Sequence, residues 1–184
     1  MRCDLSARAT LRAATADAHH RVDELFSRFD LSRRAEYAAF LQAQAAALLP
    51  LERALDAGIA PKLPVEWAAR RRSPALLADL AAWSLPIPEG EEVAPVERPA
   101  EALGTIYVLE GSRLGGSLLK RSIAGDFPAA FLSPGPSARW RSLLDGLERD
   151  LATAQMQAEA AAAALRAFAL FELAGAGPSL RNAG

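Results

Sequence analysis

His19 and His20, adjacent near the start of the chain, are its only histidines. Successive residues of a helix point about 100° apart, so two adjacent histidines cannot serve the same site. His20 has Asp17 three residues before it and Glu24 four residues after it, which places it on a charged, solvated helix face. His19 falls instead beside the apolar stripe of the same segment. It is therefore the candidate ligand, and a hydrogen-bonded histidine at the edge of the core is the alternative.

One imidazole limits the chemistry that this segment can support. A zinc site needs three or four protein ligands, whereas heme needs a single axial histidine because the porphyrin occupies four positions. Arg12 lies seven residues before His19, two turns away on nearly the same face. Its guanidinium could pair with a heme carboxylate. The alternative for Arg12 is an ordinary solvated arginine on a helix surface.

The second unusual stretch is "GTIYVLEGSRLGG", residues 104–116. Each glycine inside a helix costs about 1 kcal/mol relative to alanine, and Gly104, Gly111 and Gly115 fall along one line of a helix. Two interpretations stay open: close packing of two helices, or a flat ligand lying against bare backbone. The stretch lacks the strand-before-helix setting of a dinucleotide site and the Lys-Ser/Thr of a P-loop, which excludes nucleotide binding.

The elements that position these residues are predicted to be helices. Alanine, leucine and arginine dominate, β-branched residues are few, and strand-like alternation is scarce, so the sequence predicts an all-α fold. Ser32 is expected to cap the second helix, Pro50 to kink or divide it, and Ser73 to cap a helix that has Pro74 at its first position. The predicted helices span about residues 5–29, 32–57, 65–83, 100–124 and 137–173, with a loop at 86–99 and a frayed tail at 174–184.

Length and charge exclude several classes of protein. The 184 residues fit one domain, and 21 Lys and Arg against 22 Asp and Glu leave no bulk charge that would recruit nucleic acid or an anionic membrane. No apolar run approaches the roughly 20 residues that span a bilayer. The single cysteine, Cys3, cannot form an internal disulfide, so we expect a protein of the reducing cytoplasm.

Taken in order, several stretches resemble the bacterial heme oxygenases that make biliverdin and often accompany bacteriophytochromes. They are "LRAATADAHHRVDELFSRFDL", "LGTIYVLEGSRLGG", "FPAAFL", Trp140 and "ALRAFALFELAG". The resemblance is weakest in residues 45–100. It implies one domain over residues 1–184, with 1–4 and 175–184 frayed. It also implies a multi-helix bundle in which heme is sandwiched between a proximal N-terminal helix and a kinked, glycine-rich distal helix.

The resemblance also implies roles for individual residues. His19 would bind the iron, Gly111 and Gly115 would cover the distal face, and Arg12 and Arg141 would bind the heme propionates. Animal members of the family have an aspartate after the first distal glycine, where this chain has Ser112. Gly111, Ser112 and Gly115 are therefore the expected catalytic positions, and the residue that organises distal water is open.

The implied reaction is the cleavage of heme b, as cofactor and substrate, to biliverdin, CO and iron with O₂ and external electrons. The donor would be a ferredoxin, a flavodoxin or a reductase, and a bacteriophytochrome could accept the product. The basic cluster at residues 69–72 and the Lys120–Arg121 pair are possible donor contacts, or solvated faces. Three alternatives remain: a heme carrier or sensor without turnover, a helical interaction module, and a thiaminase-like relative for which Cys3 is poorly placed.

Overall fold

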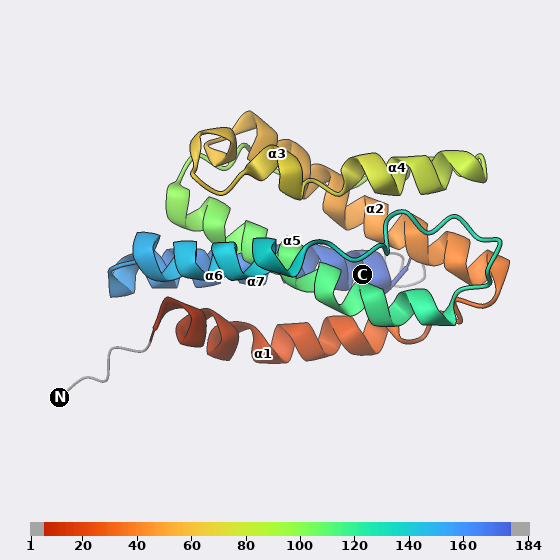
Figure 1. Ribbon diagram of the computed structural model, residues 1–184, viewed down its shortest axis with the longest axis horizontal. Coiled ribbons are helices and arrows are strands. Elements are labelled where there is room, and N and C mark those ends of the chain that lie inside the picture. The colour runs from red at the N-terminus through yellow and green to blue at the C-terminus, as the bar shows by residue number, and fades with distance from the viewer. Residues whose placement is uncertain (1–5, 178–184) are drawn as a thin grey trace, which may run out of the picture.

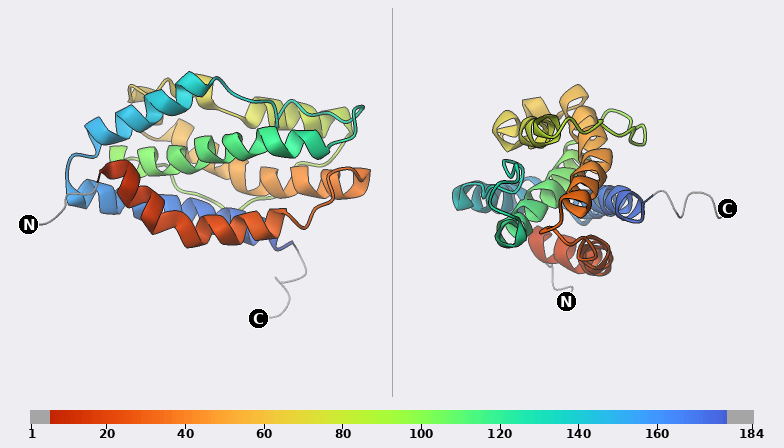
Figure 2. Two further views of the ribbon diagram at one scale, coloured as in Figure 1. Left: turned by 60° about the horizontal axis from the view of Figure 1, so that its bottom comes forward. Right: turned by 90° about the vertical axis from the view of Figure 1, so that its right-hand side faces the viewer.

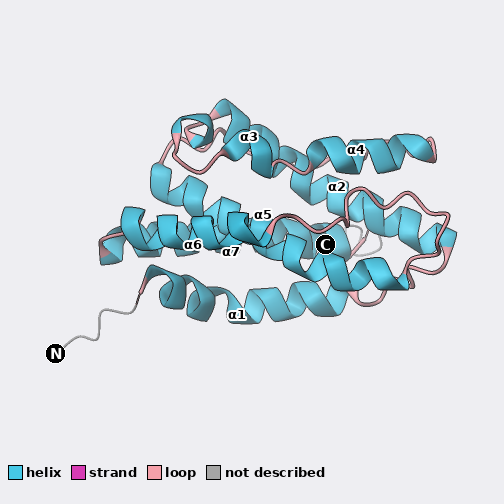
Figure 3. Ribbon diagram, viewed as in Figure 1, coloured by secondary structure: helices cyan, strands magenta, loops and turns pink. Residues whose placement is uncertain are grey.

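The computed structural model describes residues 6–177, apart from the side chains of residues 117 and 118. Over this range it contains helices and no strands, which confirms the predicted all-α class (Figure 3). The predictions for residues 1–4 and 178–184 lie outside the described residues. The α-helices are α1 (Ala7–Phe26), α2 (Arg34–Ala57), α3 (Trp67–Arg70), α4 (Ser73–Ala82), α5 (Pro99–Leu119), α6 (Ser137–Asp150) and α7 (Ala154–Gly175), with short 3₁₀ turns at Ala60–Lys62 and Lys120–Ser122.

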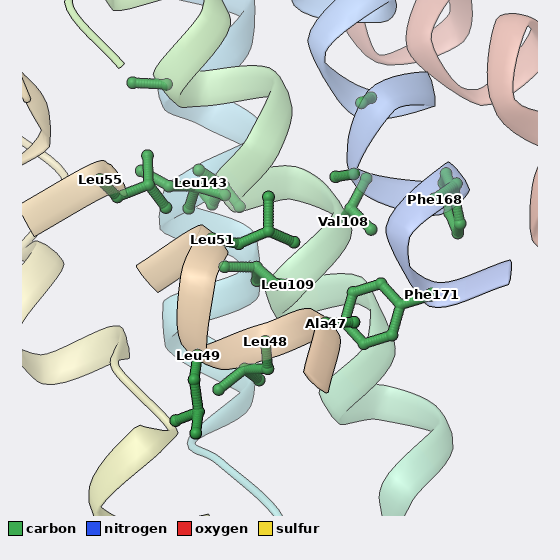
Figure 4. Packing of buried hydrophobic residues seen from close by; sticks show 14 of the residues in the cluster. Ala47, Leu48, Leu49, Leu51, Leu55, Val108, Leu109, Leu143, Phe168 and Phe171 are labelled. Carbon is green, nitrogen blue, oxygen red and sulfur yellow. The ribbon is translucent and has the colours of Figure 1, made fainter. Parts of the chain in front are cut away.

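The helices form a bundle in which α7 packs against α1, α2 and α5 (Figures 1 and 2). α1 lies on one side of the molecule and α3 and α4 on the opposite side (Figure 1). Leucines of α2 and α5 interdigitate in the core, and Phe168 and Phe171 of α7 close it from the side (Figure 4). None of the helices within residues 6–177 combines the length and apolar character needed to cross a membrane.

The sequence explains the start and the buried face of α1. The Ser6 hydroxyl accepts a hydrogen bond from the Ala9 amide at 3.2 Å, an N-cap that fixes the first turn. Leu11, Thr15 and Ala18 then recur at helical spacing and are buried, as the predicted stripe requires. The helix ends at Phe26, three residues earlier than predicted.

α2 corrects two expectations. The helix runs unbroken from Arg34 to Ala57 with Pro50 inside it, so Pro50 does not divide the helix, and a kink at Pro50 stays a prediction. Ser32 does not cap it either, because its hydroxyl donates to the Asp30 carboxylate at 2.6 Å and the N-cap residue is Arg33. Asp30 thus takes the hydroxyl that a cap would need.

The helical region predicted over 65–83, with a new start at Ser73 and Pro74, consists of the two helices α3 and α4, and α4 is capped from a distance. Ser73 is the first residue of α4 rather than its cap. The carboxylate of Glu52, buried on α2, accepts from the amides of Arg72 and Ser73 at 2.6 and 3.0 Å. A residue 20 positions away in sequence therefore does the work predicted for a local serine.

The single helix predicted over 137–173 is also wrong. It is divided at residues 151–153, where the chain reverses direction between α6 and α7 (Figure 2). The Thr153 hydroxyl accepts from the Met156 amide at 3.2 Å and caps α7. In contrast, the predicted loop at 86–99 is confirmed up to Arg98, and the glycine-bearing helix α5 runs unbroken through its four glycines.

Candidate functional site

A hollow of about 390 Å³ lies between α1 and α5 and is closed by side chains of α2, α6 and α7. Its volume is in the range typical of sites for organic ligands. Four residues predicted separately from sequence all line it: His19, Gly111, Ser112 and Gly115. Much of the remaining wall is apolar and includes Val22, Phe26, Phe40, Val108, Phe168 and Phe171.

His19 is held by its neighbours but is not fully buried. Its side chain is 58% exposed, Nδ1 lies 2.9 Å from Oδ2 of Asp23, and the ring meets Phe168 edge-on with centroids 5.8 Å apart. In a neutral imidazole that donates from Nδ1 to the carboxylate, Nε2 keeps its lone pair. The Asp23 contact therefore favours the tautomer that can bind a metal through Nε2.

His20 is the matched contrast to His19. Its side chain is 75% exposed, and its Nε2 lies 3.5 Å from Glu24. It does not line the hollow that His19 lines. The prediction that the two histidines point to different surroundings is confirmed.

The glycines of α5 fall into two groups according to what an added Cβ would meet. At Gly104 it would overlap the Ala160 carbonyl oxygen and lie 2.7 Å from the carbonyl carbon, so α5 and α7 touch backbone to backbone there. At Gly111 the nearest atom would be Cη2 of Trp140 at 3.8 Å, and at Gly115 nothing lies within 4 Å. Close packing therefore explains Gly104, while Gly111 and Gly115 border open space.

A second hollow of about 410 Å³ shares Thr15, His19, Tyr107 and Trp140 with the first one and adds Arg8 and Arg12. Within residues 6–177, no carboxylate lies within 4 Å of either guanidinium. The two guanidinium groups at this end of the site can therefore bind an anion.

Tyr107 faces the same end. Burial raises the pKa of its hydroxyl, opposed by the charges of Arg12 and Arg8 and by a hydrogen bond with Thr15. The phenol is therefore protonated at neutral pH.

Arg141 is placed differently from Arg12. It is exposed on α6 and lines neither hollow, whereas its neighbour Trp140 lines both. The structure therefore brings Arg12 to the site and leaves Arg141 on the surface beside it.

Ser112 is tied to a buried cation that sequence reasoning missed. Its hydroxyl donates to the Leu109 carbonyl at 2.8 Å and accepts from Nη1 of Arg72 at 2.7 Å. The Arg72 guanidinium stacks on Phe131 at 4.0 Å, and burial lowers its pKa to about 10. Arg72 is thus a cation at neutral pH, lying directly behind a residue of the hollow.

The cluster at residues 69–72 was expected to be a surface patch, and that expectation is wrong for Arg70 and Arg72, which are both buried. Only Arg71 is exposed, and it lies 3.3 Å from Asp56. The signal in the sequence was the apolar context: a buried Trp67 precedes the cluster and the apolar face of α4 follows it.

Sequence reasoning also missed Gln44 and Phe168. Gln44 is a polar residue on the buried stretch of α2, and Phe168 lies in the "ALRAFALFELAG" segment. Helical spacing can assign such residues to a buried face, but only the packing of α2 and α7 shows which hollow they reach. Over residues 6–177, no three His, Cys, Asp or Glu side chains group as a metal site.

The chain is similar in sequence and in fold to bacterial heme oxygenases. The chain is 31% identical over 172 residues to heme oxygenase PigA of Pseudomonas aeruginosa, covering 86% of this chain and 87% of that protein. It is 34% identical over 112 residues to a heme oxygenase of Xanthomonas campestris pv. campestris, covering 57% of this chain and 67% of that protein. No family model matches the chain. Its fold matches the crystal structure of the NO- and CO-bound heme oxygenase of Neisseria meningitidis with a TM-score of 0.76 and 25% identity, over 93% of this chain and 90% of that one.

Proposed function

The chain belongs to the heme oxygenase family, and from that premise we propose how its own residues bind heme and direct its oxidation. The observation that carries the proposal is that His19 and the bare backbone of Gly111 and Gly115 border one hollow. Bound heme supplies the iron that activates O₂ and is itself the substrate, cleaved to biliverdin with release of CO and iron.

His19 would hold the heme iron in this proposal. Asp23 accepts from Nδ1 and so orients the ring and fixes its tautomer, as carboxylate partners of metal-bound histidines do. The edge of Phe168 limits rotation of the imidazole. His20 lacks comparable support, because among residues 6–177 its polar contact is a long one to Glu24 at the surface.

Gly111 and Gly115 form the distal roof. Because no Cβ projects from either residue, a flat ring can lie close to α5, and the meso edges that the helix covers are shielded from oxidation. Their role is to admit and orient the ring rather than to exchange protons.

Arg12, together with Arg8, is proposed to hold a heme propionate at the second hollow. Arg141 is proposed for the other propionate, from the exposed face beside Trp140. The seating of the propionates would then decide which meso edge stays open and which biliverdin isomer forms.

Ser112 is proposed to act as an acceptor polarised by Arg72, where animal members place an aspartate. Its only proton is donated to Leu109, so toward the hollow the hydroxyl oxygen can accept a hydrogen bond but not donate one. An ordered water donating to Ser112, with the amide of Gln44 nearby in the lining, would supply polarity on the distal side.

Electrons and product exchange involve other proteins in this proposal. We propose an external donor of the ferredoxin, flavodoxin or reductase class that docks where Arg8 and Arg12 meet solvent. Acidic groups on such a donor would complement the two guanidinium groups. A bacteriophytochrome that takes up biliverdin, and a cytoplasmic location, belong to the same proposal.

The test is a titration of the apo-protein with hemin, followed by addition of a reductant and O₂. We expect a stoichiometric Soret band that bleaches to biliverdin absorption. His19→Ala should lose histidine ligation and lower hemin affinity, and the matched control His20→Ala should behave like the wild type. A stable band that never bleaches would leave a heme carrier or sensor, and loss of ligation in the His20 variant would overturn the ligand assignment.

A further inference from the structure

Arg70 joins three segments behind the wall of the site. Its side chain is 1% exposed, and it lies at the end of α3, outside both hollows. We propose that Arg70 is a positioning residue that fixes the gap between Gly111 and Trp140 and so determines how the ring is seated. The inference rests on the heme site proposed above.

The first link runs from Arg70 to α5. Nη1 of Arg70 lies 3.2 Å from Oε2 of Glu110, whose side chain is 5% exposed. Glu110 directly precedes Gly111 and is also 3.4 Å from Arg113. A buried ion pair with a second cation on the same carboxylate has little freedom to move, so the backbone that carries Gly111 is fixed from behind.

The second link runs from Arg70 to the first turn of α6, and it is reciprocal. Nη1 of Arg70 donates to the Arg139 carbonyl at 3.0 Å, and Nη1 of Arg139 donates back to the Ala69 carbonyl at 2.7 Å. Nε of Arg70 donates to the Val65 carbonyl, which fixes the plane of the guanidinium. Arg139 directly precedes Trp140, so this clamp sets where the indole stands.

The two links meet at the hollow. Trp140 is the nearest neighbour of a Cβ built on Gly111, at 3.8 Å, and its ring lies 5.6 Å from that of Tyr107 at an interplanar angle of 30°. Trp140 also lines both hollows. The Arg70 guanidinium thus holds the residues that directly precede Gly111 and Trp140. A shift of Arg70 therefore changes the gap between Gly111 and Trp140.

The test uses a variant that keeps the charge. Lysine in Arg70→Lys can stay near Glu110 but lacks the planar fork that serves Glu110, Val65 and Arg139 together. The matched control is Arg71→Lys, one residue away and exposed. The measurements are the hemin dissociation constant, the ratio of the two heme orientations in proton NMR spectra of the ferric cyanide complex, and urea unfolding of the apo-protein.

We expect Arg70→Lys to raise the hemin dissociation constant about tenfold and to change the orientation ratio, while the control changes neither. Trp140→Phe should shift the same ratio. In the Arg70→Lys/Trp140→Phe double variant, the change in the orientation ratio should be smaller than the sum of the two single changes, because both substitutions act on the gap between Gly111 and Trp140. A folded Arg70→Lys protein with wild-type affinity and orientation ratio would overturn the proposal.

Arg139→Met keeps the proposal testable if Arg70→Lys does not fold. It removes one half of the clamp from a half-buried position, and it should move the orientation ratio in the same direction by a smaller amount. An unchanged ratio in this variant would count against the proposal. Failure of the wild-type protein to bind hemin would instead remove the proposed function, so the two failures are distinguishable.

Discussion

The two halves of α5 use the same residue for different purposes. In the first half, Gly104 lies where the Ala160 backbone of α7 occupies the place of a side chain. In the second half, about two and three helical turns further on, Gly111 and Gly115 lie where no packed backbone does so. Spacing along the helix cannot separate these cases. What separates them is whether protein backbone occupies the space of the missing Cβ, as at Gly104, or leaves it open, as at Gly115.

The surroundings of the two halves differ as well. The first half packs against alanines of α7, which are small enough to let the helices touch. In the second half, Gly111, Ser112 and Gly115 line the hollow, while Glu110 meets the buried Arg70 and Ser112 also meets the buried Arg72. The second half of α5, which borders the hollow, is thus supported by the contacts with Arg70 and Arg72. The predictions below address this contrast.

The largest expected effect is on the packed half. Gly104→Ala places a methyl group against backbone atoms of Ala160 that cannot rotate away, so α5 and α7 must separate. We expect the free energy of unfolding to fall by about 3 kcal/mol, measured by urea unfolding of the apo-protein. Gly146→Ala on α6 is the control, because its new methyl would make only ordinary contacts from 3.6 Å outward. Equal stabilities for the two variants would show that the close approach at Gly104 is not rigid.

The second prediction concerns the open half. Gly115→Leu puts a branched side chain at a position where an added Cβ meets no neighbouring atom within 4 Å, so the apo-protein should keep its stability. Hemin affinity should fall roughly 10- to 100-fold, because the side chain occupies space meant for the ring. Ala162→Leu, on the exposed face of α7, tests for a general effect of added bulk. Unchanged hemin affinity in Gly115→Leu would return this glycine to a packing role.

The third prediction concerns the polar support behind the roof. Ser112→Ala leaves Nη1 of the buried Arg72 without its hydroxyl partner, so the free energy of unfolding should fall by about 1.5 kcal/mol. Ser142→Ala, at an exposed position of α6, should change it by less than about 0.5 kcal/mol. If Ser112→Ala and Ser142→Ala have the same free energy of unfolding, the contact between Ser112 and Arg72 contributes nothing measurable to the stability of the second half of α5.

The sequence was informative where the signal is local. The side of α1 that carries His19 and the line of glycines on α5 follow from helical periodicity, which involves residues within a few turns. The cap at Thr153 was also local, but the high helix propensity of the surrounding alanines concealed it.

Tertiary contacts set the rest of the site. Arg72 reaches Ser112 across 40 residues of sequence, and Arg70 reaches Arg139 across 69. No periodicity indicates that a run of arginines will be buried, since its burial depends on a carboxylate and carbonyls from other helices. The different roles of Gly104 and Gly111 depend in the same way on where α7 passes.

The smallest expected effect distinguishes most directly between the two halves. In a helix, alanine is more favourable than glycine by about 0.5–1 kcal/mol, chiefly because the unfolded chain has less freedom to lose. At Gly115 no protein atom within 4 Å opposes the new methyl, so Gly115→Ala should raise the stability of the apo-protein by that amount while weakening hemin binding a few-fold. Urea unfolding of the apo-protein and a hemin titration measure the two terms separately. Higher stability of the apo-protein together with weaker hemin binding means that the chain gives up helix stability at Gly115 to leave room for the heme ring. A stabilised protein that binds hemin as well as the wild type would mean that the ring does not approach Gly115, and the roof would then consist of Gly111 alone.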